Sequence, residues 1–340
     1  MQTITSEFEI FRGELARIFL SPLQNDERVE MVFNETVSSF SQSSSASSSS
    51  DDDGDDDGGV TVTFSSGKRP AERYDLLVAA DGMGSKIRGL MLGTAPREQI
   101  FDEGVHVAYW TTPFDLLHGS KLAQWYNAPL GRVIFLRPDP DPRGRTRAHF
   151  MNVTTRDDVG MEMKRRLNEA LAEGNESYKD LMEELFADAG WLAPEVIKSM
   201  RASEDFYCSL FGQVRSAKLQ DGRVVLLGDA GYATPGMGTS LAIMGSYILA
   251  GELLQSGGDV GKALERYEEL MMPFVRGQQG DFQAMQYLNP QTPWGIGVRN
   301  VLLGLLTGLK VDRMGMWVAA KLGFSEAKMV LPRYPWPEAK

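Results

Sequence analysis

Cysteine and histidine are scarce in this sequence, and their scarcity excludes several kinds of site. The one cysteine, Cys208, cannot form an intramolecular disulfide, and we expect a free, buried thiol in a reducing compartment. The three histidines, His106, His118 and His149, are too scattered along the chain to indicate a metal site. The sequence therefore predicts neither a disulfide framework nor a metal centre.

Long apolar runs and basic runs are missing as well. The first 20 residues carry scattered charges and no apolar signal-peptide core, so a cytoplasmic protein is expected. The most apolar late stretch, Ile296 to Leu309, is about 14 residues long and contains Arg299, whereas a membrane span needs about 20. We interpret it as a packed helix, with a membrane-surface or partner-binding face as the less favoured alternative. With a net charge of −11 and no basic run, a nucleic-acid partner is not expected.

A low-complexity tract, SQSSSASSSSDDDGDDDGG (41–59), interrupts the first part of the chain. It cannot bury apolar surface, so it is predicted to be a disordered loop. Strand-like sequence stands on both sides, which makes the tract an enlarged hairpin loop and not a linker between domains. Its six aspartates contribute −6 to the net charge of −11, leaving −5 elsewhere. Their spacing lacks the pattern of a calcium-binding loop, so a solvated spacer is favoured.

The rest of the chain has the composition of a globular protein, with 42% hydrophobic and 24% charged residues. Apolar residues at helical spacing in 11–19 predict a helix that ends at Ser21-Pro22. YDLLVAA (74–80) and Arg223 to Leu227 are short apolar runs typical of buried parallel strands. Residues 99–150 are rich in strand-like segments, and 161–192 has the pattern of two charged amphipathic helices.

This order of elements is typical of an α/β protein in which a strand-rich substrate domain interrupts a cofactor domain. From Thr239 the chain is predicted to be helical nearly to its end. The predicted parts are 1–95 and 211–275 for the cofactor domain, 96–210 for the substrate domain, and 276–340 for a helical C-terminal region.

The strongest chemical signal is a strand-to-helix turn in LLGDAGYATPGMGTS (226–240). An apolar strand runs into Gly228-Asp229, and a turn containing Pro235, Gly236 and Gly238 precedes a helix that Thr239 or Ser240 is expected to cap. Free N–H groups and the helix dipole at such a turn favour a phosphate or another anion. The Asp229 carboxylate would repel a phosphate, and it is better suited to accept hydrogen bonds from sugar or ribityl hydroxyls.

A second turn, DGMGSKIR (81–88), has the same order of features. A strand is followed by Asp81-Gly82, by small residues, and by a helix start with Ser85 and Arg88. Each turn contains two glycines in a GxG pattern, and neither continues as GxGxxG, which occurs nowhere in the chain. Taken alone, either turn could be an ordinary tight loop. The pairing of two such turns favours a cofactor site.

These residues carry a resemblance to a known family. RYDLLVAADGMGSKIR (73–88) and GRVVLLGDAGYATPGMGTSLAIMGSYILAGEL (222–253) resemble the paired Asp-Gly and Gly-Asp motifs of FAD-dependent monooxygenases of the para-hydroxybenzoate hydroxylase type, the class A flavoprotein hydroxylases. EIFRGELARIFL (9–20) is similar to the helix that carries a flavin-contacting arginine in this family, here Arg12. The resemblance spans about residues 9 to 270.

The resemblance implies a flavoprotein oxidoreductase with an incomplete, Rossmann-like FAD-binding domain. Within it, Gly228 and Asp229 would hold the ribityl-pyrophosphate part of FAD, and Asp81 and Gly82 would contact FAD and NAD(P)H, supported by Ser85 and Arg88. The residues expected against the isoalloxazine ring are Pro235, Gly236, Gly238 and Thr239.

The implied chemistry is reduction of FAD by NAD(P)H and transfer of one atom of molecular oxygen to a small hydrophobic or aromatic substrate, as in secondary metabolism. Because the cofactor performs this chemistry, no catalytic side-chain dyad is expected. Five aromatic residues in the strand-rich middle are candidates for the substrate pocket, with packing in the sheet core as the favoured alternative: Trp110, Trp125, Tyr126, Phe135 and Phe150.

The family pattern begins with a strand, a GxGxxG turn and a helix, which this sequence does not contain. The expectations that follow are a truncated monooxygenase, a flavin-free relative that acts as a binding or assembly protein, or a partner that supplies the missing layer. A plain nicotinamide dehydrogenase is disfavoured, because its own fingerprint is missing too.

Overall fold

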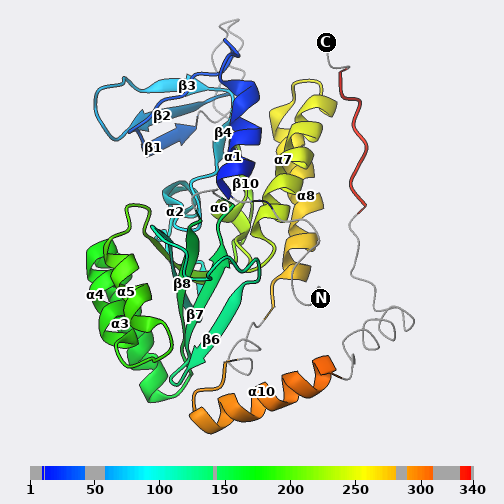
Figure 1. Ribbon diagram of the computed structural model, residues 1–340. Helices are drawn as coiled ribbons and strands as arrows, with labels where there is room; N and C mark the ends of the chain where they lie inside the picture. The colour runs from blue at the N-terminus through cyan, green and yellow to red at the C-terminus, as the bar shows by residue number, and fades with distance from the viewer. Residues whose placement is uncertain are drawn as a thin grey trace, which may run out of the picture. The chain divides into compact units, whose positions relative to one another are not determined.

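The structure is a computed structural model that describes residues 10, 12–42, 58–140, 144–280, 289–308 and 330–337 (Figure 1). The chain divides into two compact units, one made of residues 1–41 and 61–73 and the other of residues 42–60 and 74–340.

The first unit contains the predicted N-terminal helix, α1 (Arg12–Leu20), which passes into a short 3-10 turn, η1 (Ser21–Leu23), at the expected Ser-Pro stop. Three strands follow in the order β1-β2-β3, with bounds β1 (Val37–Gln42), β2 (Val60–Phe64) and β3 (Glu72–Tyr74). That β1 and β2 are neighbours confirms that strands flank the serine- and aspartate-rich tract. Most of the tract, residues 43–57, lies outside the described residues.

The second unit contains a small sheet with the order β10-β11-β4, formed by β10 (Gln220–Asp221), β11 (Val224–Leu226) and β4 (Leu77–Ala79). β11 and β4 are parallel and β11 is fully buried, as the two apolar runs predicted. The expectation that β4 is buried on both faces is wrong, because Val78 is 38% exposed. Among the described strands of this sheet β4 is one of the two edge strands, so it has a strand neighbour on one side only.

Helices follow both parallel strands. α2 (Lys86–Leu92) comes after β4, and α6 (Asp229–Tyr232) and α7 (Gly238–Gln255) come after β11. α8 (Val260–Gln278) packs against α7 through an apolar core that includes Leu241, Ile248 and Leu264. Within this core Tyr267 donates a hydrogen bond of 3.0 Å to the Leu226 carbonyl and so connects α8 to the end of β11.

The second unit also contains a five-stranded sheet in which every neighbouring pair is antiparallel, in the order β6-β7-β8-β5-β9. The strands are β5 (Ile100–Thr112), β6 (Gln124–Ala128), β7 (Arg132–Pro138), β8 (Thr146–Val153) and β9 (Tyr207–Val214). β7 and β8 form a hairpin, and their register ends at Pro138 opposite Thr146.

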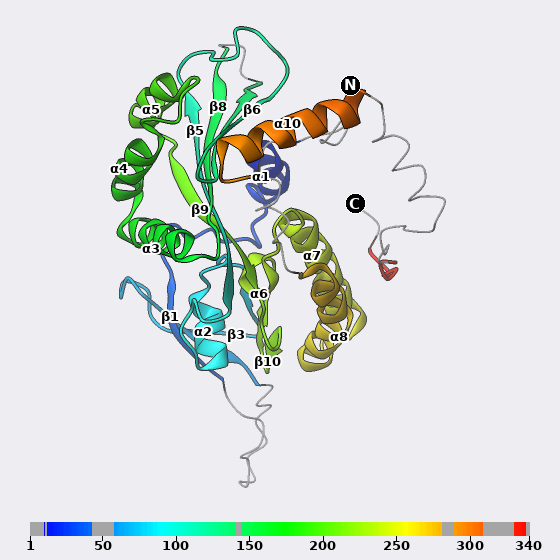
Figure 2. The ribbon, with the colours of Figure 1, turned by 90° about the horizontal axis from the view of Figure 1, so that it is seen from below.

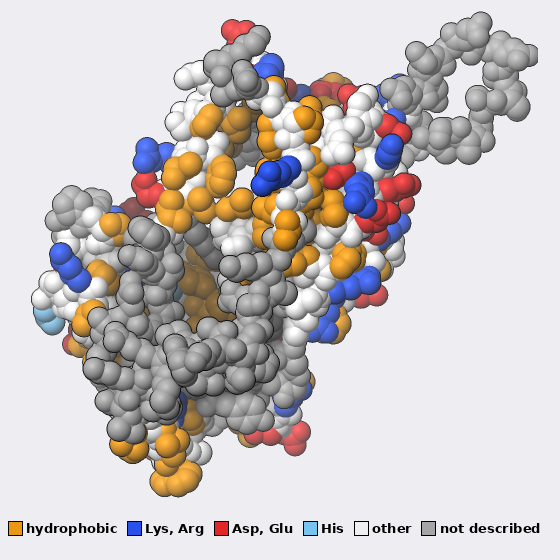
Figure 3. All heavy atoms as spheres, turned by 90° about the vertical axis from the view of Figure 1, so that its right-hand side faces the viewer, with side chains coloured by type: hydrophobic (Ala, Val, Ile, Leu, Met, Phe, Trp, Pro, Cys, Tyr) orange, Lys and Arg blue, Asp and Glu red, His pale blue; other side chains and the backbone are white. Residues whose placement is uncertain are grey.

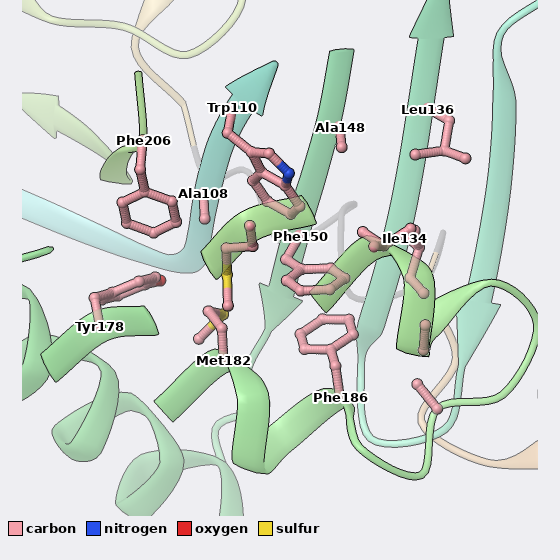
Figure 4. Close-up of a cluster of buried hydrophobic side chains, with 14 of the residues drawn as sticks. Ala108, Trp110, Ile134, Leu136, Ala148, Phe150, Tyr178, Met182, Phe186 and Phe206 are labelled. Atoms are coloured by element: carbon pink, nitrogen blue, oxygen red, sulfur yellow. The ribbon is translucent and has the colours of Figure 1, made fainter. Parts of the chain in front are cut away.

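Three helices cover one face of this sheet: α3 (Asp158–Glu173), α4 (Asn175–Phe186) and α5 (Ala193–Arg201) (Figure 2). The sequence predicted two of them, and α5 was missed. Their core includes Phe150 stacked on Phe186, with ring centroids 3.9 Å apart, and Trp110 across from Phe206 (Figure 4). The indole of Trp110 donates to the Ser199 hydroxyl at 2.9 Å, so its one polar atom is satisfied.

The C-terminal region contains α10 (Pro293–Gly308), as the apolar stretch predicted. Residues 330–337 have no helical structure, although the region 276–340 was expected to be helical apart from a break near Pro332. Prolines at 332, 335 and 337 explain the difference, because proline removes the N–H that a helix needs. No helix within the described ranges is long and apolar enough to cross a membrane.

Candidate functional site

The two turns that the sequence singled out follow the carboxyl ends of β4 and β11, and so lie at the same end of the small sheet. In the parallel pair, Ala79 is the register partner of Leu226, and the Leu227 N–H donates to the Ala79 carbonyl at 2.9 Å. Asp81 and Asp229 follow these strand ends by two and three residues. Parallel strands therefore bring the turns together at their carboxyl ends, the edge at which ligands bind in open α/β sheets.

The Asp-Gly turn is organised by its own side chains. The Asp81 carboxylate accepts from the Ser85 hydroxyl at 2.6 Å and from the Lys86 N–H at 3.0 Å. Ser85 in turn caps α2, because its hydroxyl accepts from the Arg88 N–H at 2.9 Å. Gly82 has a φ of 84°, a conformation that favours glycine. Asp81 is exposed at the surface of the turn, whereas Ser85 is buried beneath it.

Arg88 lies completely buried between the two turns. Its Nη1 donates to the Ala230 carbonyl in α6 at 2.7 Å, and Nη2 donates to the Met83 carbonyl at 2.8 Å and to the Pro96 carbonyl. Burial lowers the pKa of the guanidinium from its ordinary value. Arg88 thus connects the Asp-Gly turn to the Gly-Asp turn, and its place is underneath the surface that a cofactor would touch.

The Gly-Asp turn exposes backbone groups and the carboxylate of one side chain, Asp229. Gly228 is buried with a φ of 62°, and its carbonyl accepts from the N–H groups of Gly231 and Tyr232. Asp229 is exposed, and a Cβ on Gly238 would lie only 3.2 Å from its Oδ1. The absence of a side chain at 238 therefore lets the start of α7 approach the Asp229 carboxylate.

The first turn of α7 has no side-chain cap. Its N-cap residue is Met237, so the expectation that Thr239 or Ser240 caps the helix is wrong. Both residues already lie within the helix and are exposed. The turn that leads into the helix contains the half-buried Pro235 and Gly236, which has a φ of 79°. The helix start therefore presents backbone N–H groups and the positive end of its dipole to a ligand.

This donor set fits the flavin half of FAD. It combines a carboxylate for hydroxyl groups, an uncapped helix start for negative charge, and glycines where a ring would lie close to the backbone. Arg12 lies in α1, within the predicted helix, but its side chain lies outside the described residues, so its flavin contact stays a prediction.

The second feature of the site is the face of the five-stranded sheet that α3, α4 and α5 do not cover. Strand alternation places Val105, Val107, Val133, Met151 and Val153 on this face, where they form a buried apolar cluster. Beyond this cluster an aromatic row crosses all five strands in one register line: Trp125, Phe135, His149, Tyr109 and Tyr207.

The members of this aromatic row touch in sequence from one edge of the sheet to the other. Ring centroids are 5.2 Å apart for Trp125 and Phe135, 5.3 Å for Phe135 and His149, and 5.0 Å for His149 and Tyr109. Tyr109 and Tyr207 follow at 6.0 Å. Trp125 is 45% and Tyr207 51% exposed, so the row is accessible at both ends. The rings are tilted by 32° to 86° from one to the next, so the row offers both ring faces and ring edges to an aromatic ligand.

His149 is the polar centre of the row. Its Nδ1 lies 3.1 Å from the Phe135 carbonyl oxygen. A carbonyl only accepts, so we assign the proton to Nδ1, which leaves Nε2 as a hydrogen-bond acceptor. Burial, and to a lesser extent Arg137 and Arg147, lowers the pKa of His149 to about 4. The imidazole is therefore neutral at pH 7.

Sequence reasoning missed His149 and did not separate the aromatic candidates. Trp110 and Phe150 pack in the helix-covered core, and Tyr126 stacks on Trp191. Trp125 and Phe135 belong to the aromatic row. The parity of residues along each strand could have made this division, but only with the register between strands known. Within the described ranges no group of three or more His, Cys, Asp or Glu residues could hold a metal ion.

Comparison with known proteins assigns the class. No family model matches the chain. It is 28% identical to the FAD-dependent monooxygenase asL4 of Sarocladium schorii, over 98% of this chain and 76% of that protein. It is 27% identical to the monooxygenase CTB7 of Cercospora beticola, over 98% and 75%. Among solved structures, tetracycline destructase Tet(51) is similar with a TM-score of 0.63 and 27% identity, over 82% of this chain and 66% of that one.

The fold is therefore that of a flavin-dependent oxidoreductase. In sequence the chain is similar to FAD-dependent monooxygenases over nearly its whole length.

The buried Arg88 generates the first prediction. Arg88→Met removes the donors to three backbone carbonyls and leaves these acceptors buried, which we expect to cost about 3 kcal/mol of unfolding free energy. Urea unfolding measures the change. The matched control is Lys86→Met on the same helix, an exposed position that should change stability by less than about 0.5 kcal/mol. Equal stability of the two variants would contradict the role of Arg88 as the connection between the turns.

His149 generates a prediction on pH. Its pKa of about 4 in the folded state lies below the ordinary value of 6.5, so the folded state binds fewer protons than the unfolded state. Stability is then complete above about pH 6.5 and decreases as the pH falls toward 4. Between pH 7 and pH 5 His149 should account for a loss of about 2 kcal/mol. His149→Phe should lack this part of the loss in urea unfolding at the two pH values, and an unchanged loss would refute the assignment. His106 is retained in both proteins and shifts in the same direction.

Proposed function

We propose that this monooxygenase holds the flavin half of FAD at the Asp-Gly and Gly-Asp turns and oxygenates an aromatic, hydroxyl-bearing substrate that lies over the apolar cluster and extends to the aromatic row. The observation that supports this most is the meeting of both turns at one sheet edge. β9 ends at this edge, because the Val214 N–H at its last residue donates to the Ala233 carbonyl at 3.0 Å. Ala233 directly precedes the turn before α7. Tyr207 is the first residue of β9 and Val214 the last, so the aromatic row crosses the sheet about 23 Å from this edge.

Each turn residue has a proposed role toward the cofactor. Asp229 and Gly228 receive the ribityl part, and Pro235, Gly236, Gly238 and Thr239 lie against the ring, where the start of α7 stabilises negative charge. Asp81 and Gly82 contact FAD from the other turn and also contact NAD(P)H, the reductant. Ser85 and Arg88 support both turns from the interior. FAD, when bound, supplies the redox chemistry that activates molecular oxygen.

The sheet face has a proposed role toward the substrate. The apolar cluster of Val105, Val107, Val133, Met151 and Val153 keeps water from the surface on which the substrate lies. The aromatic row stacks against a planar substrate, and Nε2 of His149 accepts a hydrogen bond from its hydroxyl group. Because His149 is neutral at pH 7, it orients the hydroxyl group and carries no charge that would need a counter-ion.

The cofactor assignment is tested by flavin binding. We expect the purified chain to retain FAD after desalting, and Asp229→Ala to weaken FAD binding at least tenfold through the loss of hydrogen bonds from ligand hydroxyls. Quenching of flavin fluorescence measures the affinity. Asp158→Ala, an exposed aspartate in the first turn of α3, is the matched control and should bind FAD normally. A folded chain that takes up no FAD would refute the proposal for this chain.

The substrate assignment is tested with paired probes. A naphthol and its methyl ether have the same rings, but only the naphthol can donate a hydrogen bond. The wild-type chain should bind the naphthol about tenfold more tightly, and His149→Phe should bind both alike. Equilibrium dialysis measures both affinities without turnover. Retained discrimination in His149→Phe would show that another group recognises the hydroxyl.

A further inference from the structure

Helix α7 is apolar on all sides. Its 18 residues, GTSLAIMGSYILAGELLQ, include a single charged residue, Glu252, which is only 8% exposed. A helix of this kind needs cover on more than one side. α8 covers one side through the core that contains Leu241, Ile248 and Leu249. Figure 3 shows apolar side chains gathered on the face of the molecule that carries α7 and α8.

Residues 330–337, which we call the C-terminal strap, cover a second side of α7 (Figure 1). The ring of Tyr334 lies directly on Gly251, where any Cβ would overlap the ring. Tyr334 is 8% exposed, and its hydroxyl donates to Oε1 of Glu252 at 2.7 Å. The one polar side chain of α7 that is buried thus receives its hydrogen bond from the strap.

Two further contacts hold the strap in place. The hydroxyl of Tyr247 donates to the Pro332 carbonyl at 3.0 Å. The rings of Tyr247, Tyr334 and Trp336 contact one another, with centroids 5.4 to 5.7 Å apart. Prolines at 332, 335 and 337 restrict the strap to extended conformations, which lowers the entropy lost when it docks.

The two ends of α7 differ in how they are held. The strap fixes the second half of the helix, whereas no side chain caps the first turn, which faces the cofactor turn. A helix of 18 residues behaves as a rod, so a restraint on one half limits the tilt of the other.

We propose that the C-terminal strap is a latch that positions α7 toward the flavin, with Tyr334 as the positioning residue that fits onto Gly251. Engagement of the strap fixes the direction of the α7 dipole at the Gly-Asp turn. The effect on flavin rests on the function proposed above, whereas the effect on α7 itself does not.

The test removes the same contact from opposite sides. Tyr334→Ala deletes the ring, and Gly251→Val fills the space that the ring occupies. Hydrogen exchange followed by mass spectrometry on the full chain should show exchange about tenfold faster over residues 247–255 in both variants, and FAD affinity should fall about tenfold. Val330→Ala changes a strap residue that is 89% exposed and is the matched control, with both readings as in the wild type. Tyr334→Phe, which keeps the ring and loses only the bond to Glu252, should lie between.

Exchange over 247–255 that is unchanged in Tyr334→Ala and Gly251→Val would overturn the latch. Faster exchange with unchanged FAD affinity would overturn the positioning role, because the strap would then stabilise the helix alone. If the wild-type chain takes up no FAD, the proposed function fails, while the exchange result still decides on the latch. Should the two larger changes prevent folding, Tyr334→Phe and Trp336→Ala each weaken one contact and give the same two readings.

Discussion

The parallel pairing of β4 with β11 is the constraint on which the site depends. It brings two turns that are distant in sequence to one edge, and Arg88 then joins them through backbone carbonyls. Burying a guanidinium without a carboxylate in contact is costly, and the cost is offset only while the carbonyl acceptors of both turns stay in place. The hydrogen bonds of Arg88 therefore favour a single relative arrangement of Asp81 and Asp229.

The two faces of the five-stranded sheet have different roles. Alternate residues of the same strands form the core under α3, α4 and α5 and, on the other side, the apolar cluster and the aromatic row. Packing on the covered face, where Phe150 stacks on Phe186, supports the strands that carry the aromatic row. An aromatic surface with one neutral acceptor, His149, is a means of orienting an aromatic substrate for a cofactor that performs the chemistry itself.

The parts of the molecule that could be predicted are those written in local sequence. YDLLVAA and residues 223–227 were correctly predicted as parallel strands, and the paired turns at their ends indicated the FAD-dependent monooxygenases to which the chain is similar. The exposure of Val78 could not be predicted, because it depends on which strands join the sheet. The N-cap of α7 is Met237 and not Thr239 or Ser240, because the helix begins at Gly238, two or three residues earlier than these polar side chains suggest. His149 required the register of five strands, and the strap on Gly251 required a contact between residues 83 positions apart.

The central claim is that both turns contact one flavin, and hydrogen exchange with and without FAD tests it most directly. The account predicts that added FAD slows exchange together at residues 82–88 and 228–242, while α3, α4 and α5 exchange as before. Protection of only one turn, or protection confined to other parts of the chain, would contradict a site shared by the two turns.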